Sequence, residues 1–573
     1  MISRQKHINF LGALFLVLMS VPATSNADWV SPRLKYSVNA KASEIESILY
    51  GAEKMNSCPG LKLVVTCGNT KCEKELGETI ENCAPDCVPA PIISYNNQTR
   101  CTDVKSVYKP ESEKEVQTIV RHAVSQGQHI KVVGNSHSAN QILCTDGIAI
   151  VTEKLNQVLG LEMFEGVETV KVQSGMLIWD LNEWLYKRGK VIGYSIMGFR
   201  QVTIGGAIGT GSHGSSVKHN AVISNIIQSI TLVDSKGNLR EFSKGTTPEN
   251  TWKALTVNFG LLGVVTQVRL KVESAKNLDT RVSFHHESEL FNSKDGVFAP
   301  VKNCDFGVMN WFPGTRKFMK VCGTVTNKKT DAGATNNLLN PPLPAKLVNV
   351  SKQVLQLGAC HQGTGCLVES LRYSMMKIAP PIQKLNFRGK LKSTRHAIGP
   401  IHAMVSSDLT EYQKGFFQMD WEIAVPKSRA NEAMKAVLAH IRNHNICLPL
   451  VGVFLRFTPS MDESLMSHTT AYKDFIKGEP VVYLEMPVYL PVGFSSEMKH
   501  KYDVVFEDFA KLLIHQYGAR AHWGKNRDWV FSMQRDQDVY GENLKKFQSV
   551  VDEMDPHGVF SNQFAHNIGI QYH

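Results

Sequence analysis

The chain of 573 residues lacks the features that mark several classes of protein. It contains no internal repeat and no low-complexity tract, so the sequence indicates neither a solenoid nor a disordered protein. Its Lys and Arg residues are scattered, and a formal net charge of +11 is modest for this length, so we expect no nucleic-acid binding. No apolar run is long enough to cross a bilayer, so we expect no stable membrane insertion.

The cysteines lack the pairing that zinc sites use. None of the 12 cysteines forms a CxxC pair, so we expect no metal site. Instead, six cysteines lie between Cys58 and Cys101, and Cys144 follows. This density favours disulfides, although the spacing does not define which cysteines pair.

The N-terminus resembles a secretory signal peptide. Arg4 and Lys6 precede the apolar run Phe10–Val21, and the small residues Ser25 and Ala27 provide a cleavage site. We therefore expect residues 1–27 to be removed and the protein to be secreted, periplasmic or otherwise extracytoplasmic. The alternative is an uncleaved anchor. Removing the two basic residues would leave a net charge of +9.

The rest of the chain divides by pattern. Hydrophobic residues make up 43% and charged residues 20%, which is ordinary for a globular protein, and the length allows two or three domains. Periodicity predicts helices over 112–126, 176–188, 429–444, 497–517 and 542–554, and strands over 129–133, 148–152, 168–173, 226–233 and 264–272. We expect an α+β protein made of a Cys-rich segment (28–98), a first domain (99–275), a second α/β domain (276–500) and a C-terminal segment (501–573).

A loop after the first predicted strand carries Gly134, Asn135, Ser136, His137 and Ser138. A β-run that enters a glycine and small polar residues exposes several backbone N–H groups, which is how a chain binds a pyrophosphate. The loop is not GxGxxG, so it does not indicate a nicotinamide cofactor. A tight turn with a surface histidine is the alternative.

A second stretch, 201–216, has five glycines in sixteen residues. Glycines let a ligand lie against bare backbone, and the interleaved Thr, Ser and His can donate hydrogen bonds. We therefore expect a cofactor-binding loop here and in the stretch 258–265 that follows. The candidate residues are Gly205, Gly206, Thr210, Gly211, Ser212, His213, Gly214, Ser215, Gly263 and Val265.

Near the C-terminus, the segment 520–527 places Arg520, His522 and Lys525 beside Trp523. Such groups can bind a polyhydroxylated, partly anionic substrate and act as acid, base or electrostatic stabiliser. The alternative is a basic surface turn with a half-buried tryptophan.

Taken in order, VVGNSHS (132–138), CTDG (144–147), TIGGAIGTGSHGSS (203–216), GLLGVVTQV (260–268) and HWGKNRD (522–528) resemble the vanillyl-alcohol-oxidase-type flavoproteins. Within them the chain is similar to the sugar 1,4-lactone oxidases, above all the L-gulonolactone oxidase group of the secreted plant type. The resemblance implies a two-part FAD-binding domain with an α/β cap domain for the substrate.

The resemblance also implies roles for individual residues. His137 matches the histidine that is joined covalently to the flavin in many members. The glycine loops would hold the rest of FAD. Lys525 matches a lysine near the flavin and the substrate hydroxyl, with His522 close by, and Arg456 matches a substrate-facing arginine of the cap. The expected reaction takes a hydride from C2 of a lactone such as L-gulonolactone, while the hydroxyl proton moves towards His522 or Lys525. Oxygen would then accept the electrons, and the products would be ascorbate or an analogue and hydrogen peroxide.

One position departs from the pattern. Many lactone oxidases have a glutamate two residues before the arginine, whereas this chain has Phe454. Glu422 and Glu485 are candidate replacements, and each could instead be a structural carboxylate. The change leaves open a second function, the oxidation of another carbohydrate or alditol. A third alternative is a secreted, non-catalytic protein that kept the fold.

Overall fold

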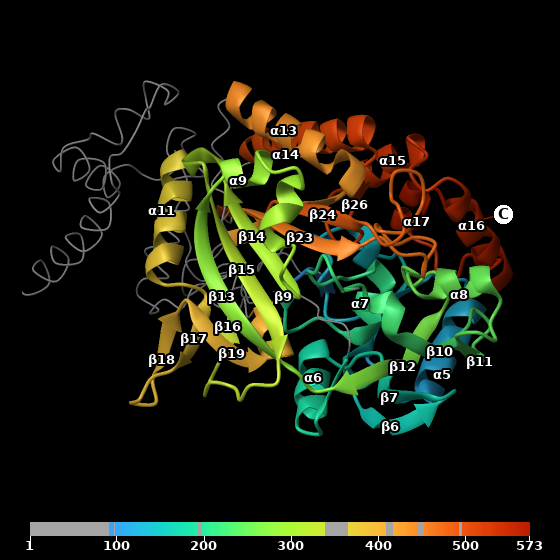
Figure 1. Ribbon diagram of the computed structural model, residues 1–573. Helices are drawn as coiled ribbons and strands as arrows, with labels where there is room; N and C mark the ends of the chain where they lie inside the picture. The colour runs from blue at the N-terminus through green and yellow to red at the C-terminus, as the bar shows by residue number, and fades with distance from the viewer. Residues whose placement is uncertain are drawn as a thin grey trace, which may run out of the picture.

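The computed structural model describes residues 91–96, 98–192, 198–219, 221–337, 365–407, 416–444, 452–491 and 496–572 (Figure 1). The expected signal peptide and nearly all of the Cys-rich segment lie outside these residues and stay predictions.

The first part of the fold contains two sheets. The strands β3 (Ser106–Tyr108), β5 (Ile148–Val151) and β4 (Ile130–Val133) form a small parallel sheet. Helix α5 (Glu113–Ser125) covers it through Val116, Val120 and Ala123, and the Ser112 hydroxyl caps the helix by accepting the Glu115 amide at 3.3 Å. The larger sheet is antiparallel, with the order β11 (Leu239–Ser243), β10 (Ile227–Val233), β12 (Val264–Ser274), β7 (Val167–Gln173) and β6 (Val158–Phe164), and β8 (Lys190–Ile192) pairs with β12.

The second part is an antiparallel sheet of eight strands (Figure 1). Helices α13 (Lys427–Asn443) and α14 (Ser496–Tyr517) pack against it at β22, and α11 (Gly365–Ile378) packs against β14. The last strand comes from the C-terminal segment, which brings residues after 520 to the edge of this sheet. The strand order is β19 (His396–Pro400), β13 (Asn277–His286), β15 (Lys317–Thr326), β14 (Phe306–Phe312), β23 (Val453–Pro459), β24 (Pro480–Glu485), β22 (Glu422–Pro426) and β26 (Arg520–Ala521).

Shorter elements connect the two parts and close the C-terminal end. Three two-stranded sheets pair β1 (Ile92–Ile93) with β2 (Arg100–Cys101), β9 (Gly198–Phe199) with β20 (Ser406–Ser407), and β21 (Phe416–Met419) with β25 (Val488–Pro491). A three-stranded sheet contains β16 (Thr335–Asn336), β17 (Ile382–Leu385) and β18 (Leu391–Thr394). The remaining helices are α6 (Ile178–Tyr186), α7 (Ile204–Thr210), α8 (Glu249–Leu255), α9 (Ser288–Phe291), α12 (Ile401–Val405), α15 (Asp528–Asp536), α16 (Glu542–Met554) and α17 (Gln563–Ile568). The 3₁₀ turns are η2 (Gln141–Leu143), η3 (Thr152–Lys154), η4 (Ile223–Ile226), η5 (Gly296–Val301) and η6 (Pro313–Thr315). No described helix has the length and apolar character needed to cross a membrane.

The predicted helices and strands are confirmed to within a few residues, but the prediction of a loop over 201–216 is wrong in part. Residues Ile204–Thr210 form the helix α7, in which the Thr203 hydroxyl accepts the Gly206 amide at 3.1 Å. Gly211 ends the helix at φ 66°, a left-handed conformation that favours glycine. Ile204, Ala207 and Ile208 are fully buried, and this burial offsets the low helix propensity of the glycines.

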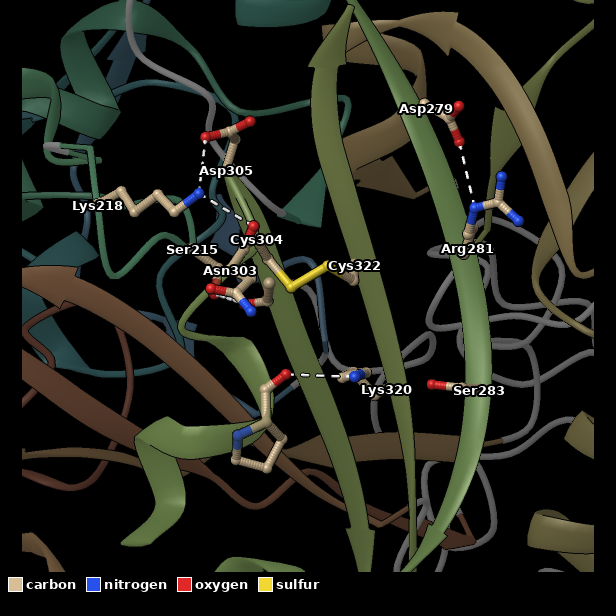
Figure 2. The surroundings of a disulfide bond; sticks show 12 residues. Ser215, Lys218, Asp279, Arg281, Ser283, Asn303, Cys304, Asp305, Lys320 and Cys322 are labelled. Atoms are coloured by element: carbon tan, nitrogen blue, oxygen red, sulfur yellow. Dashed lines mark hydrogen bonds and ion pairs between the residues drawn. A yellow bond between two sulfur atoms is a disulfide. The ribbon is translucent and has the colours of Figure 1, made fainter. Parts of the chain in front are cut away.

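Disulfides are confirmed where the structure describes the cysteines. Cys101 pairs with Cys144, which ties β2 to the end of η2, and Cys304 pairs with Cys322 on β15 (Figure 2). Beside the second bridge, Lys218 reaches from the first part of the fold and donates to the Asn303 carbonyl at 3.0 Å (Figure 2). A single hydrophobic cluster also includes both Ile204 and Trp421, so the two parts share one core.

Candidate active site

The predicted loops meet along one cavity between the two parts of the fold. The cavity has a volume of about 1310 Å³, counting the space at its open mouth. Its lining includes these residues predicted from the sequence: Gly134, Asn135, Ser136, His137, Ser138, Gly205, Gly206, Thr210, Ser212, His213, Gly263, Val265, Arg456, His522 and Lys525.

Three of the predicted cofactor residues have other surroundings. Gly211, Gly214 and Ser215 are not among the residues that line the cavity. Gly211 ends α7, and the Gly214 amide donates to the Ala221 carbonyl at 2.6 Å. The Ser215 hydroxyl donates to the Gly307 carbonyl and accepts the Phe457 amide, so it joins this loop to the cap sheet. The structure therefore gives these three residues structural contacts, and their contact with the cofactor stays a prediction.

The loop after β4 has the shape of an anion-binding turn. Ser136 has a φ of 54°, and the Asn135 side chain donates to the Gln201 carbonyl at 3.0 Å. A Cβ atom on Gly134 would lie 2.2 Å from the Thr203 hydroxyl, so only glycine lets the two loops approach. Among the described residues, no partner is found for the amides of residues 135–138. These amides fit the pyrophosphate of a dinucleotide.

His137 is placed for contact with the cofactor. Its ring stacks on Tyr95, with centroids 4.6 Å apart, and lies 5.3 Å from the ring of Phe199. The buried Nδ1 atom has no hydrogen-bond partner in the described part of the chain. Burial lowers the pKa of His137 to about 4, so the imidazole is neutral and keeps a lone pair. An unpaired, neutral nitrogen at the cavity wall fits the covalent flavin bond that the sequence predicted.

The C-terminal segment 522–525 is bound directly to this loop. Asn140 donates from Nδ2 to the Trp523 and Lys525 carbonyls, both at 2.8 Å, and the Ala139 amide donates to the Gly524 carbonyl at 2.8 Å. Trp523 is 1% exposed and donates from Nε1 to the Met466 carbonyl. The segment is therefore part of the core, and the alternative of a basic surface turn is wrong.

Lys525 and Arg456 belong to a buried ion-pair network. Lys525 Nζ contacts Glu485, lies 3.3 Å from Glu422 Oε2 and lies 3.7 Å from Asp420 Oδ2. Arg456 contacts Glu422, and its nitrogen lies 3.1 Å from Glu485 Oε2. Burial opposes the charge of Lys525, but attraction to the three carboxylates outweighs it and raises the pKa of Lys525. Lys525 is thus protonated in this environment, which favours the donation of a hydrogen bond over the acceptance of a proton.

Three buried histidines, His213, His468 and His522, lie next to this network. His213 Nδ1 donates to the Gly214 carbonyl at 2.9 Å, so its Nε2 faces Glu422 Oε1 at 3.4 Å. Its ring stacks on Tyr483 with centroids 3.7 Å apart. His522 stacks on His468, and its Nδ1 accepts the Gly524 amide at 3.0 Å. Burial holds the pKa of His522 well below its ordinary value, so this ring is neutral.

The ligand atoms of His213, Glu422 and His522 lie within 4.8 Å of one another, a spacing that could hold a metal ion. However, His522 Nδ1 already accepts an amide, and in the neutral ring its other nitrogen then carries the proton. Glu422 is also already paired with two cations. We therefore interpret this group as part of the ion-pair network.

Two residues that line the cavity, Tyr95 and Lys131, were not predicted from the sequence. Tyr95 lies at the end of the predicted Cys-rich segment, yet its hydroxyl donates to Asp420 at 2.7 Å and its ring covers His137. Lys131 also lines the cavity, and its ammonium donates to the Phe259 carbonyl at 2.6 Å. Burial lowers the pKa of Lys131 to about 7. A lysine inside the apolar strand 129–133 was the one signal that could have identified it.

Comparison with known proteins agrees with this geometry. The FAD binding domain family matches residues 104–243, and the D-arabinono-1,4-lactone oxidase family matches residues 268–568. The L-gulonolactone oxidase of Mus musculus is 24% identical over 461 residues, which cover 80% of this chain and 94% of that protein. L-gulonolactone oxidase 2 of Arabidopsis thaliana is 25% identical over 518 residues, covering 83% and 82% of the two chains.

Among solved structures, a solvent-stable cholesterol oxidase superposes with a TM-score of 0.65 at 16% identity, covering 83% of this chain and 97% of that one. At this identity the likeness shows the fold, which is the vanillyl-alcohol-oxidase type expected from the sequence. Fold and site together define an FAD-dependent oxidoreductase that acts on CH–OH groups. More narrowly, the chain belongs to the D-arabinono-1,4-lactone oxidase family of sugar lactone oxidases.

Proposed function

We propose that the protein oxidises a sugar 1,4-lactone similar to L-gulonolactone at the C2 hydroxyl, with oxygen as the electron acceptor. The products would be ascorbate or an analogue and hydrogen peroxide. One observation carries the proposal: the cavity that has cofactor-type glycine loops along its wall also contains Arg456, Lys525 and Glu485. Charged hydrogen-bonding groups of both signs suit a polyhydroxylated ring, and the names of the relatives indicate lactones.

The chain would contribute binding, orientation and electrostatics. FAD, when bound, supplies the acceptor for the hydride. Amides of the loops around Gly134 and Gly205 would hold the dinucleotide, and His137 would fix it covalently. Lys525 is protonated, so it would donate a hydrogen bond to the reacting oxygen and stabilise negative charge that develops near it. Arg456 would orient a ring oxygen, and the neutral His522 would shape the floor of the site.

A second candidate function is the oxidation of another carbohydrate or an alditol. Phe454 favours it, because an aromatic side chain stands where many lactone oxidases have a carboxylate. A non-catalytic protein is not favoured, because the cavity keeps Lys525 and Arg456 in an ion-pair network with three carboxylates. Burying so many charged groups is costly for stability, and a catalytic role would account for that cost.

Steady-state assays of aldonolactones, alditols and hexoses, read by peroxide formation and by dye reduction, separate these functions. We expect a lactone to give the highest kcat/KM and peroxide to form in step with its oxidation. Lys525→Ala should lower kcat by about 10²-fold or more with little loss of flavin, whereas the exposed control Lys545→Ala should not change it. Preference for an alditol would overturn the lactone assignment.

We also propose that the protein is exported after removal of residues 1–27. The disulfides Cys101–Cys144 and Cys304–Cys322 support this, because such bonds persist in oxidising compartments. Fractionation of the native host and N-terminal sequencing test it, and an intact Met1 on a protein of the reducing cytosol would contradict it.

A further inference from the structure

Glu485 occupies a special position in the cavity. It is the only acidic side chain among the described residues that line the cavity, and it is 6% exposed. It ends strand β24, and its two oxygens contact different cations, Lys525 at Oε1 and Arg456 at Oε2. The carboxylate is therefore fixed in orientation where a substrate hydroxyl would meet both cations.

The charges around Glu485 do not balance. Asp420, Glu422 and Glu485 bring three carboxylates to two cations, Lys525 and Arg456. The carboxylates and Arg456 are buried, and Lys525 is partly buried. Arg527 also acts on Asp420, but it is paired with Asp503. One uncompensated negative charge in such a place is costly, so the group has a strong affinity for one proton. Because Asp420 and Glu422 are absent from the cavity wall, Glu485 is the carboxylate that can exchange this proton with a bound molecule.

The electrostatic direction agrees with the geometry. Burial raises the pKa of Glu485, and repulsion by Glu422 and Asp420 adds to the increase, while Arg456 and Lys525 oppose it. Glu422 comes from the neighbouring strand β22, and Asp420 lies just before that strand. Arg456 comes from β23 and Lys525 from the C-terminal segment, and these four are the charged groups that act on Glu485. A carboxylate whose pKa is raised in this way is a stronger base than an ordinary carboxylate.

The two residues of the C-terminal segment that were expected as proton acceptors are occupied. Lys525 is protonated, and His522 Nδ1 accepts the Gly524 amide. In the neutral ring of His522 the remaining nitrogen carries a hydrogen and cannot accept one. Glu485 is thus the carboxylate on the cavity wall that can exchange a proton with a ligand.

We propose that Glu485 is the catalytic base of the reaction. Its carboxylate takes the proton from the substrate O–H while the carbon of the same CH–OH group loses a hydride, with both electrons, to oxidised FAD. The C–H and O–H bonds break, a C=O double bond forms, and Glu485 becomes a neutral carboxylic acid. The proton leaves to solvent after the product departs. This inference rests on the proposed function in requiring a hydroxylated sugar substrate.

Anaerobic single-turnover reduction of the flavin, followed across a range of pH, tests the proposal on the complete protein. Glu485→Gln keeps the shape of the side chain and removes the base. We expect the limiting rate of reduction to fall by about 10²- to 10⁴-fold, and the rise of the wild-type rate with pH to disappear. Flavin content and the rate at which oxygen reoxidises chemically reduced flavin should stay unchanged. The exposed control Glu553→Gln should behave as wild type.

A limiting rate within about threefold of wild type, or a retained pH profile, would overturn the role of Glu485. If Glu485→Gln holds no flavin, the same measurement is made on Glu485→Asp. A lower limiting rate of reduction with a shifted pH profile supports Glu485 as the base, and a wild-type pH profile overturns that role. If an alditol but no lactone reduces the wild-type flavin, only the lactone assignment fails, and the same test proceeds with the alditol. A wild-type flavin that neither reduces would overturn both proposals.

Discussion

Phe454 and Glu485 lie directly opposite each other on the antiparallel strands β23 and β24. Paired residues of this kind point to the same face of the sheet, and their Cβ atoms are close neighbours. The carboxylate that the sequence lacks at position 454 is therefore present across the strand pair at position 485. Glu422, the other candidate, pairs with Glu485 from the opposite side but lies outside the cavity wall.

Asn140 connects the cofactor loop to the segment that carries Lys525. Replacing it by Ala removes two hydrogen bonds to the Trp523 and Lys525 carbonyls and the bond from the Ile142 amide. We expect stability to fall by about 1–3 kcal/mol and kcat to fall more than flavin content, because the position of Lys525 depends on this side chain.

Asn140→Asp provides the matched variant, since it keeps the acceptor for Ile142 and loses both donors. Thermal unfolding and steady-state kinetics check both proteins. An Asn140→Asp variant with full activity would contradict the role of these contacts.

Gly134 allows the two glycine-containing stretches to touch. A Cβ atom at this position would lie 2.2 Å from Thr203 Oγ1 but 3.4 Å from Thr203 Cβ. Gly134→Ala should therefore reduce the flavin content of the purified protein, and adding Thr203→Ala should restore part of it. Thr203→Ala alone should cost about 1 kcal/mol, because it removes the cap of α7. Absorbance at the flavin bands per protein gives the result, and no rescue in the double variant would refute the contact.

His137 is predicted to carry the flavin. His137→Ala should abolish covalent attachment and leave some bound FAD, because the loop amides and α7 would still line the cavity. Acid precipitation reads the outcome: the colour should stay with the wild-type pellet and leave the pellet of the variant. Colour lost from both proteins would show that no covalent bond exists.

Glu369 should make stability fall as pH rises. Its carboxyl is 2% exposed and accepts the Gly314 amide at 2.9 Å, and burial raises its pKa to about 8. Between its unfolded value near pH 4.5 and the folded value, the native state keeps a proton that the unfolded state has lost. The stabilising contribution is complete below the lower value and is lost as pH rises through the higher one, by about 1.4 kcal/mol per pH unit.

Glu369→Gln should therefore lose less stability than wild type over this window. Calorimetric Tm values of both proteins measured at several pH values provide the comparison. Parallel Tm profiles would show that Glu369 does not titrate in this way.

Local structure was largely predictable from the sequence. Ser112 marks the start of α5, and the pattern over 429–444 predicts α13 to within two residues of its observed bounds Lys427–Asn443. The helix α7 was missed, because five glycines indicate a loop unless burial of Ile204 and Ile208 is known. Propensity is a weak guide where tertiary packing decides the outcome.

The site was predictable only in part. The motifs identified His137 and Lys525, but they could not show that Lys525 is held protonated by Asp420, Glu422 and Glu485. This network depends on the register of β22, β23 and β24, which no local pattern defines. Tyr95 was missed for the same reason, since its partner Asp420 lies 325 positions away.

The most direct test of the account is the visible spectrum of the purified protein, recorded without oxygen while L-gulono-1,4-lactone is added. We predict that the protein carries oxidised FAD and that the lactone bleaches its bands within the turnover time, with the colour returning when oxygen is admitted. A protein without flavin bands, or a flavin that the lactone leaves oxidised, would contradict the central claim that this cavity brings FAD and a sugar lactone together.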